Sequence, residues 1–132
     1  MARVYGRWQA EVVQARSASR VLAIWCMDWP AVAAAVSAEL SATAPVAVTL
    51  ANRVIACSTA ARAAGVKRGL RRREAQARCP QLHVVTADPA RDARFFESVT
   101  TAVDDLVPRA EVLRPGLLVL SVRGAARFFG SE

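Results

Sequence analysis

Short apolar runs alternate with longer helical patterns along the chain. The run at 21–27 is continuous and too short for a long helix, so it predicts a strand buried on both faces. Asp28 followed by Trp29-Pro30 predicts a helix start capped by Asp28, because proline is favoured in the first turn. Further apolar runs predict strands at 46–50, 53–57, 82–86, 110–113 and 117–122.

The predicted helices differ in character. The segment 30–41 is mostly alanine and valine, which predicts a helix with a small apolar surface, and Pro45 follows it. Asp88-Pro89 begins a second helix that reaches about Val107 and has one apolar face. The apolar residues at helical spacing on that face are Phe95, Val99, Val103 and Leu106. Ala51-Asn52 between two strands predicts a hairpin turn. A short helix is expected at 124–129, closed by Gly130.

Arginine dominates the charge of the chain. The net charge is +7, and Lys67 is the only lysine. Codon bias in a GC-rich genome would produce this composition, and so would selection for an anionic partner such as nucleic acid. Clustering favours the partner, because residues 62–78 hold seven cations and a single acid, Glu74. The cations are Arg62, Lys67, Arg68, Arg71, Arg72, Arg73 and Arg78.

The length suits one domain, and no apolar run is long enough to cross a membrane. No apolar stretch follows Arg3 and Arg7, so we expect neither a secretory signal nor a membrane partner. Cys26, Cys57 and Cys79 are too far apart for a zinc or disulfide framework. We therefore expect three small core residues, no cofactor, and a protein of the reducing cytoplasm.

One stretch has a specific order of residues. From 53 to 80, a strand leads into a turn, a helix with Ala61-Arg62, the loop Gly65-Val66-Lys67-Arg68-Gly69, and a second helix with Ala75 that ends at Cys79-Pro80. This order resembles the fingers region of Y-family (DinB/UmuC-like) DNA polymerases. The resemblance spans residues 21–130. Because family members are much longer, we expect an N-terminal fragment or a truncated product.

The pattern and the resemblance together predict a mixed α/β (α+β) fold. A palm-like mixed sheet would be backed by two helices and would carry a small basic helical fingers lobe. We expect an N-terminal extension at 1–20, with little order or docked through Trp8. The first part of the palm would be 21–57, the fingers-like basic module 58–81, and the truncated second part of the palm 82–132.

The resemblance also implies where polymerase chemistry would be located. Y-family palms hold two Mg²⁺ ions with one aspartate after the first strand and an Asp-Glu pair on a later one. These positions fall on Cys26 and on Pro115-Gly116, so all three ligands are replaced. Asp28 alone cannot hold two ions that repel each other. The family's sugar-screening aromatic falls on Ala31 and its triphosphate-contacting tyrosine on Thr59, while its arginine is kept as Arg62.

We therefore predict an inactive homologue that has no catalytic residues, no metal site and no cofactor. It is similar to the ImuB-type subgroup, which implies a non-catalytic adaptor in translesion synthesis and damage-induced (SOS) mutagenesis. The implied partners are an error-prone C-family replicative polymerase, a RecA-like accessory protein and the sliding clamp, through regions absent here. Non-specific contact with primer–template DNA would come from Arg62, Lys67, Arg68, Arg71, Arg72 and Arg73.

Other interpretations of these residues stay open. The arginines at 71–73 could be a solvated helix face, which would leave a protein-interaction module that does not touch DNA. An active template-directed polymerase is the other alternative. Asp104-Asp105 are consecutive on a helix, so a solvated face is expected rather than a metal pair. His83 is expected in the core or at the surface, and Trp25 and Trp29 in the core or lining a groove.

Overall fold

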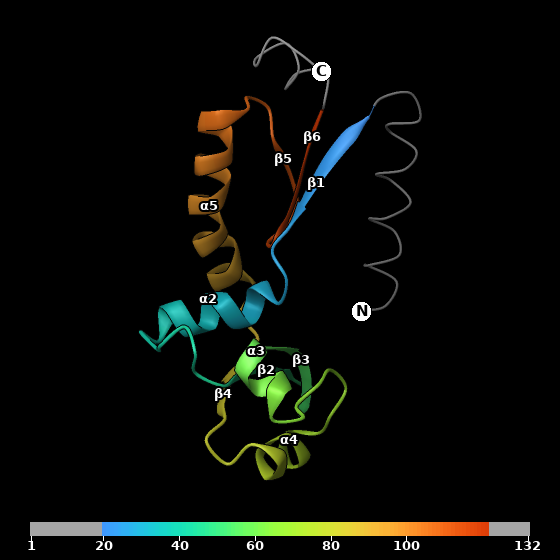
Figure 1. Cartoon of the computed structure of the whole chain (residues 1–132), viewed down its shortest axis with the longest axis vertical. Coiled ribbons are helices and arrows are strands. Elements are labelled where there is room, and N and C mark those ends of the chain that lie inside the picture. Colours follow the sequence, from blue (N-terminus) through green and yellow to red (C-terminus); the bar gives the residue numbers. More distant parts are fainter. Residues whose placement is uncertain (1–19, 122–132) are drawn as a thin grey trace.

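A computed structural model describes residues 20–121 of the chain. Two three-stranded sheets form two lobes, with a short helix between them (Figure 1). The strands are β1 (Val21–Trp25), β2 (Val46–Leu50), β3 (Arg53–Cys57), β4 (His83–Thr86), β5 (Glu111–Arg114) and β6 (Leu117–Ser121). The helices are α2 (Trp29–Ser37), α3 (Thr59–Ala63), α4 (Arg72–Arg78) and α5 (Pro89–Leu106).

The first sheet has the strand order β1-β6-β5 and is antiparallel throughout. Its register runs from Val21 opposite Ser121 to Trp25 opposite Leu117. Helix α5 lies along this sheet (Figure 1) and buries Phe96 against Leu118 and Leu120. Asp88 caps α5, because its carboxylate accepts a hydrogen bond from the Arg91 N–H at 3.0 Å. The apolar side chains of this lobe thus form one core between a helix and a sheet.

The second sheet has the order β3-β2-β4, with β3 antiparallel and β4 parallel to β2. Ala51 and Asn52 join β2 to β3 with φ angles of 49° and 62°. Two positive φ angles at a two-residue connection match the twist of a hairpin, so the predicted turn is confirmed. One face of the sheet packs against α3 and α4 around Val54, Ala61 and Ala75. On the other, α2 packs Ala31 and Ala34 against Val46 and Val48.

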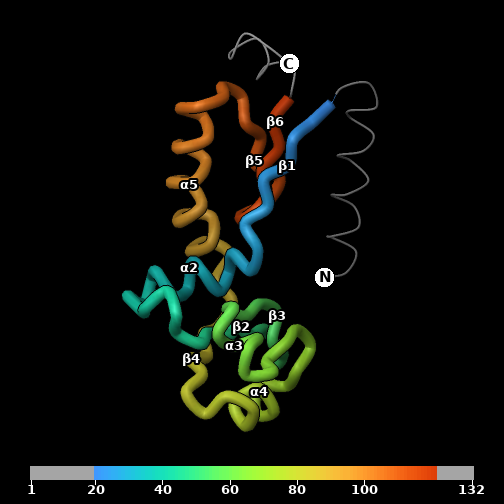
Figure 2. The backbone as a smooth tube through the Cα atoms, viewed as in Figure 1, coloured from blue at the N-terminus to red at the C-terminus, as the bar shows by residue number. Residues whose placement is uncertain are grey.

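The mixed α/β class is confirmed, with the strands divided between two sheets rather than joined in one palm-like sheet. The two lobes and the short α2 between them are also visible along the backbone trace (Figure 2). Helix α2 ends at Ser37, before the predicted 41. The predicted helix at 124–129 and the predicted extension at 1–20, except Arg20, lie outside the described residues. No helix within 20–121 is long and apolar enough to cross a membrane.

Two burial predictions are wrong. Strand β1 is an edge of its sheet, so Trp25 is 58% exposed and Leu22 51% exposed instead of buried on both faces. On α5 the buried aromatic is Phe96 rather than Phe95, and Leu106 is 63% exposed. Phe95 lies next to the guanidinium group of Arg94 instead, 5.4 Å from its ring centroid. The local sequence pattern shows neither that β1 lies at the edge of its sheet nor which face of α5 packs on that sheet. These two tertiary arrangements decide which side chains are buried.

We expect the exposed β1 edge to cause self-association. An edge strand offers unpaired backbone groups, and here it adds exposed Val21, Leu22 and Trp25. Leu22→Lys places a charge on that edge and should shift the sedimentation profile toward monomer. Val36→Lys, at an apolar site on α2 that is 55% exposed, is the matched control and should leave the profile unchanged. Monomeric wild-type protein at high concentration would contradict this expectation.

Candidate functional site

The end of β1 meets the β5–β6 turn in the first lobe. The Cys26 N–H donates a hydrogen bond to the Gly116 carbonyl oxygen at 2.7 Å. The two segments onto which the resemblance places metal ligands, Cys26 and Pro115-Gly116, therefore lie together. Gly116 has a φ of +93°, and a Cβ added there would lie 2.6 Å from the Trp29 Cβ. A side chain at 116 would collide with Trp29, so this junction has no space for a carboxylate on Gly116.

Trp29 is fixed in this position by two contacts. Its indole Nε1 donates a hydrogen bond to the Asp92 carbonyl oxygen at 2.9 Å. Its ring meets Phe96 edge to face, with centroids 5.1 Å apart. Trp29, expected in the core or lining a groove, is partly buried and packs against the core around Phe96, whereas Trp25 is exposed. The Trp29 ring thus belongs to the core that joins α2 to α5.

A pocket of about 360 Å³ lies between α2 and α3. It brings together Asp28, Ala31, Thr59 and Arg62, which come from two separate stretches of the sequence. Asp28 occupies the cap position of α2 with a φ of 51°, but its side chain makes no capping hydrogen bond. Its carboxylate pairs with the Arg62 guanidinium instead. Asp28 therefore precedes α2 at the predicted cap position, but its side chain does not cap the helix.

Arg62 is occupied by interactions within the protein. Besides Asp28, it donates hydrogen bonds to the Cys57 carbonyl oxygen at 3.1 Å and the Thr59 hydroxyl at 3.2 Å. The hydrogen bond to Asp28 raises the pKa of Arg62, so this cation stays charged. Burial, aided by the negative charge of Asp28, raises the pKa of the Cys57 thiol. The Cys57 thiol is therefore a protonated core group rather than a nucleophile. Cys79 is also buried, as predicted, and Cys26 is half-buried.

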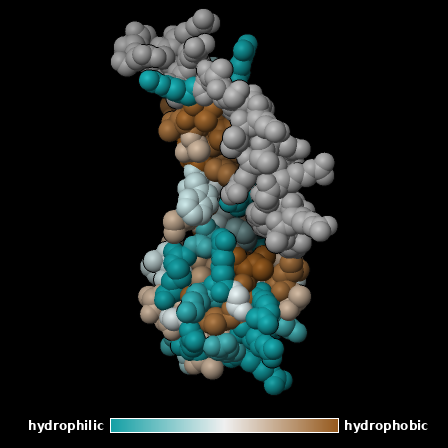
Figure 3. Space-filling view, turned by 90° about the vertical axis from the view of Figure 1, so that its right-hand side faces the viewer, coloured by the Kyte–Doolittle hydropathy of each residue, from teal (hydrophilic) through white to brown (hydrophobic). Residues whose placement is uncertain are grey.

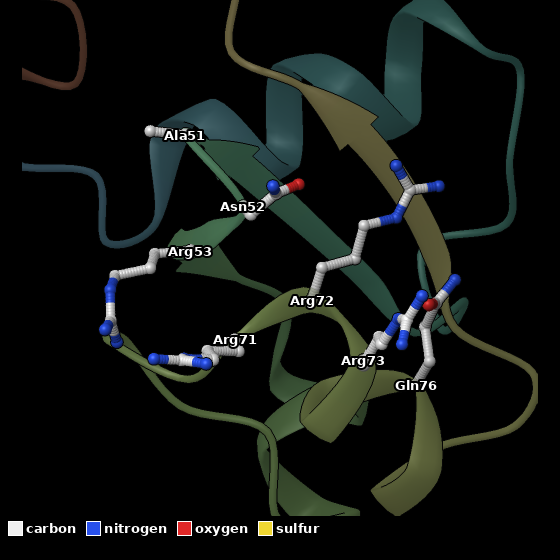
Figure 4. Close-up of a pocket in the computed structure, with 7 residues that line it drawn as sticks. All are labelled: Ala51, Asn52, Arg53, Arg71, Arg72, Arg73 and Gln76. Carbon is white, nitrogen blue, oxygen red and sulfur yellow. The ribbon is translucent and has the colours of Figure 1, made fainter.

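An open pocket of about 780 Å³ lies at the start of α4 (Figure 4). We call it the arginine pocket. Its lining is polar and basic, with no acidic side chain among the lining residues. Hydrophilic side chains also cover much of the α3–α4 lobe on the face shown in Figure 3. The lining residues are Ala51, Asn52, Arg53, Arg71, Arg72, Arg73 and Gln76.

The structure divides the predicted DNA-binding residues into three groups. Arg71, Arg72 and Arg73 meet in the arginine pocket. Lys67 and Arg68 are exposed in the preceding loop but do not line the pocket, and Arg62 faces the pocket that contains Asp28. Sequence reasoning missed Arg53, Asn52 and Gln76. The predicted hairpin turn located Asn52, but no local signal indicated that this turn packs against the start of α4.

The structure also locates the two consecutive aspartates of α5 and His83. Asp104 and Asp105 are exposed, as expected for a solvated face, and Asp104 accepts a hydrogen bond from the Ala110 N–H at 3.2 Å. His83 is exposed on β4. Within the described part of the chain, no three histidine, cysteine, aspartate or glutamate residues gather as a metal site would require.

The family model described as impB/mucB/samB (IMS) matches residues 27–132, which is most of the chain. The chain belongs to this family. No curated protein sequence matches it. The relation to Y-family DNA polymerases that the 53–80 stretch predicts is therefore confirmed at the level of family and fold.

Solved structures agree with this assignment. A Dbh ternary complex matches with a TM-score of 0.66 and 18% identity over 82% of this chain and 32% of that one. A Y-family DNA polymerase chimera of Dbh and Dpo4 matches with a TM-score of 0.70 and 16% identity, over 85% and 34%. DinB from Sulfolobus solfataricus matches with a TM-score of 0.62 and 18% identity, over 76% and 30%. The chain spans about a third of the length of these proteins.

Proposed function

We propose that this chain is a non-catalytic Y-family polymerase-like adaptor in DNA damage tolerance, of the ImuB type, that contacts DNA without sequence preference. In this proposal it works in the cytoplasm during translesion synthesis and induced mutagenesis. Its protein partners are an error-prone C-family replicative polymerase, a RecA-like protein and the sliding clamp. The three free cysteines are compatible with that reducing compartment.

The geometry at Gly116 is the observation that carries the non-catalytic part. Polymerase chemistry needs several carboxylate oxygens that converge on two divalent ions. At this junction one position where the family has a metal-binding carboxylate is Cys26. Another is Gly116, where an added Cβ would lie 2.6 Å from the Trp29 Cβ. Asp28, the nearest carboxylate in sequence, is paired with Arg62. These contacts support a cleft that does not assemble a two-metal site.

Metal binding tests this part directly. Crystals soaked in millimolar Mn²⁺ with a deoxynucleoside triphosphate should show no anomalous peak beside Cys26 and Gly116. An active Y-family polymerase treated in the same way is the positive control and should show its metal pair. Two ions bridged by protein oxygens at this junction would overturn the non-catalytic proposal and favour the active-polymerase alternative.

The DNA contact rests on the uncompensated arginines at the start of α4. Neutralising a phosphate releases condensed counterions, so affinity falls as salt rises. Replacing Arg71, Arg72 and Arg73 together by alanine should lower the log–log salt slope on a primer–template by about two to three units, at about 0.7–0.9 per phosphate contact. Helix content should change little, because alanine is at least as good a helix former as arginine. The measurement is fluorescence anisotropy across a salt series.

Arg94→Ala removes a single exposed positive charge from α5, away from the arginine pocket, and should leave the slope nearly unchanged. An unchanged slope and affinity in the triple variant would instead favour the interaction module that does not touch DNA.

A further inference from the structure

Among the described residues, the sheet β1-β6-β5 has a helix along one face only. Leu118 and Leu120 point toward α5, where they pack around Phe96. Because side chains alternate along a strand, Leu117 and Val119 lie on the opposite face of the sheet. In Figure 1, α5 runs along one side of this sheet, and no second described helix runs along the other side. We call this second side, which no described helix covers, the open face.

The exposed apolar surface of the open face lies along β1. Paired residues share a face, and the register pairs Trp25 with Leu117 and Ala23 with Val119. Trp25 is 58% exposed and Val21 is 39% exposed, whereas Val119 in the central strand is 3% exposed. Contiguous exposed apolar side chains mark a contact with another segment or chain, which single scattered ones do not. The side chains of β1 on this face therefore offer a docking surface.

The segment that precedes β1 has apolar residues at a helical spacing. Val4, Trp8 and Val12 recur every fourth residue, which places them on one side of a helix. Ser17-Ala18-Ser19 follows as a signal for a break in the chain before β1. The sequence of residues 1–19 thus suits a helix that turns back over the sheet and presents Trp8 to it.

The lengths of the two segments agree. A helix rises about 1.5 Å per residue, so it spans about 14 Å from Ser17 back to Trp8. A strand rises about 3.4 Å per residue, so Val21 and Trp25 are also about 14 Å apart along β1. A helix that turns back at Ser17 and runs antiparallel to β1 therefore brings Trp8 level with Trp25. Val12 would then lie above the middle of the strand.

The covalent connection favours this segment over a separate partner. Arg20 joins residues 1–19 directly to β1. Docking within one chain across a short connection has an effective concentration on the order of millimolar, which a second chain in dilute solution does not reach. A weak apolar contact can therefore form within the chain under conditions in which the same contact between two chains would not.

We propose that residues 1–19 dock on the open face as an amphipathic helix, with Trp8 packed against Trp25. The sheet would then have α5 on one face and the N-terminal segment on the other. While it stays docked, the segment closes the open face to other partners. This inference goes beyond the DNA contact proposed above and does not depend on it.

Photo-crosslinking in the whole 132-residue chain tests the contact. Trp8→p-benzoylphenylalanine places a photoreactive ketone at the proposed contact, and mass spectrometry locates the product. The expected link joins position 8 to β1 or β6 of the same chain. Gln9→p-benzoylphenylalanine is the matched control, because it moves the probe by about 100° around a helix. It should link to these two strands several-fold less.

A charge at position 8 tests the same contact without a probe. Trp8→Asp should release the segment and raise the oxidation of Trp25 by hydroxyl radicals several-fold. Gln9→Asp adds the same charge one residue away and should leave Trp25 at the wild-type level. Met27, which is 54% exposed and lines the pocket between α2 and α3, is the internal control and should be oxidised equally in all three proteins. Circular dichroism checks that each variant is folded.

The outcomes distinguish the possible occupants of the open face. Covalent dimers that increase with protein concentration would assign this face to a second copy of the chain and overturn the proposal. Links from position 8 mainly to the lobe of β2, β3 and β4, or to neither sheet, would overturn it as well. So would equal linking from positions 8 and 9, or unchanged oxidation of Trp25 in Trp8→Asp. None of these results bears on the DNA contact, which the salt series tests separately.

Discussion

Gly116→Ala is expected to lower the free energy of unfolding by about 3 kcal/mol, the sum of backbone strain and overpacking. Its φ of +93° is a conformation that residues with a Cβ rarely adopt. In addition, the new Cβ would lie 2.6 Å from the Trp29 Cβ and 3.3 Å from the Cys26 carbonyl oxygen. Chemical denaturation followed by tryptophan fluorescence measures the change, because Trp29 is at the point of collision.

Gly69→Ala separates the two causes. Gly69 has a nearly equal φ of +88°, but nothing lies within 4 Å of a Cβ added there. In this control the free energy of unfolding should therefore fall only by the cost of backbone strain, about 1–2 kcal/mol. The difference between the two variants measures the clash with Trp29. Equal losses in Gly69→Ala and Gly116→Ala would show that the junction accommodates a side chain, and would remove the main support for a non-catalytic cleft.

The same contacts determine what an acidic side chain at position 116 would require. An acidic residue at 116 must displace Trp29, whose indole is hydrogen-bonded to the Asp92 carbonyl and packed against Phe96. Restoring a carboxylate at Cys26 alone would supply one ligand without its partner. A carboxylate at 116 would thus need the contacts between Trp29 and α5 to change.

Local signals predicted much of this fold. The Ala51-Asn52 turn and the Asp88-Pro89 start of α5 depend on residues adjacent in sequence, and both are observed. The division into two sheets, the exposure of β1 and the pairing of Asp28 with Arg62 depend on contacts between distant segments. The candidate site shows the same contrast between residues that are adjacent in sequence and contacts between distant segments. The arginines at 71–73 could be found as a run, whereas Arg53 joins them only through its bridge to Arg71.

Arg91→Met is expected to destabilise the protein by about 3 kcal/mol at neutral pH, because it leaves a buried carboxylate without its cation. Arg91 is 5% exposed and Asp92 is 8% exposed, and the Arg91 guanidinium contacts the Asp92 Oδ1 at 3.0 Å. Arg91 also donates a hydrogen bond to the Thr86 carbonyl oxygen at 3.4 Å. The Asp92 carbonyl oxygen accepts a hydrogen bond from the Trp29 indole Nε1. The pair therefore lies where α5, α2 and β4 meet, between the two lobes.

The loss of unfolding free energy caused by Arg91→Met, called the deficit below, should depend on pH. Burial raises the pKa of Asp92, whereas Arg91 lowers it, so removing Arg91 raises this pKa further. A carboxyl whose pKa is higher in the folded state favours folding fully below its ordinary pKa of about 3.9, and this contribution is lost as the pH rises through the raised value. The deficit should thus be largest at neutral pH and should shrink as the solution is acidified. Thermal denaturation at a series of pH values measures it.

The double variant Arg91→Met with Asp92→Asn provides the control. An uncharged side chain at 92 removes the buried unpaired charge, so the double variant should recover most of the lost stability at neutral pH. The remaining deficit, from the hydrogen bond to Thr86 and altered packing, should hardly change with pH because no titrating group is left at position 92. If Arg91→Met alone showed the same deficit at every pH, or if the double variant were no more stable than the single one, Arg91 would act here by packing rather than by compensating the charge of Asp92.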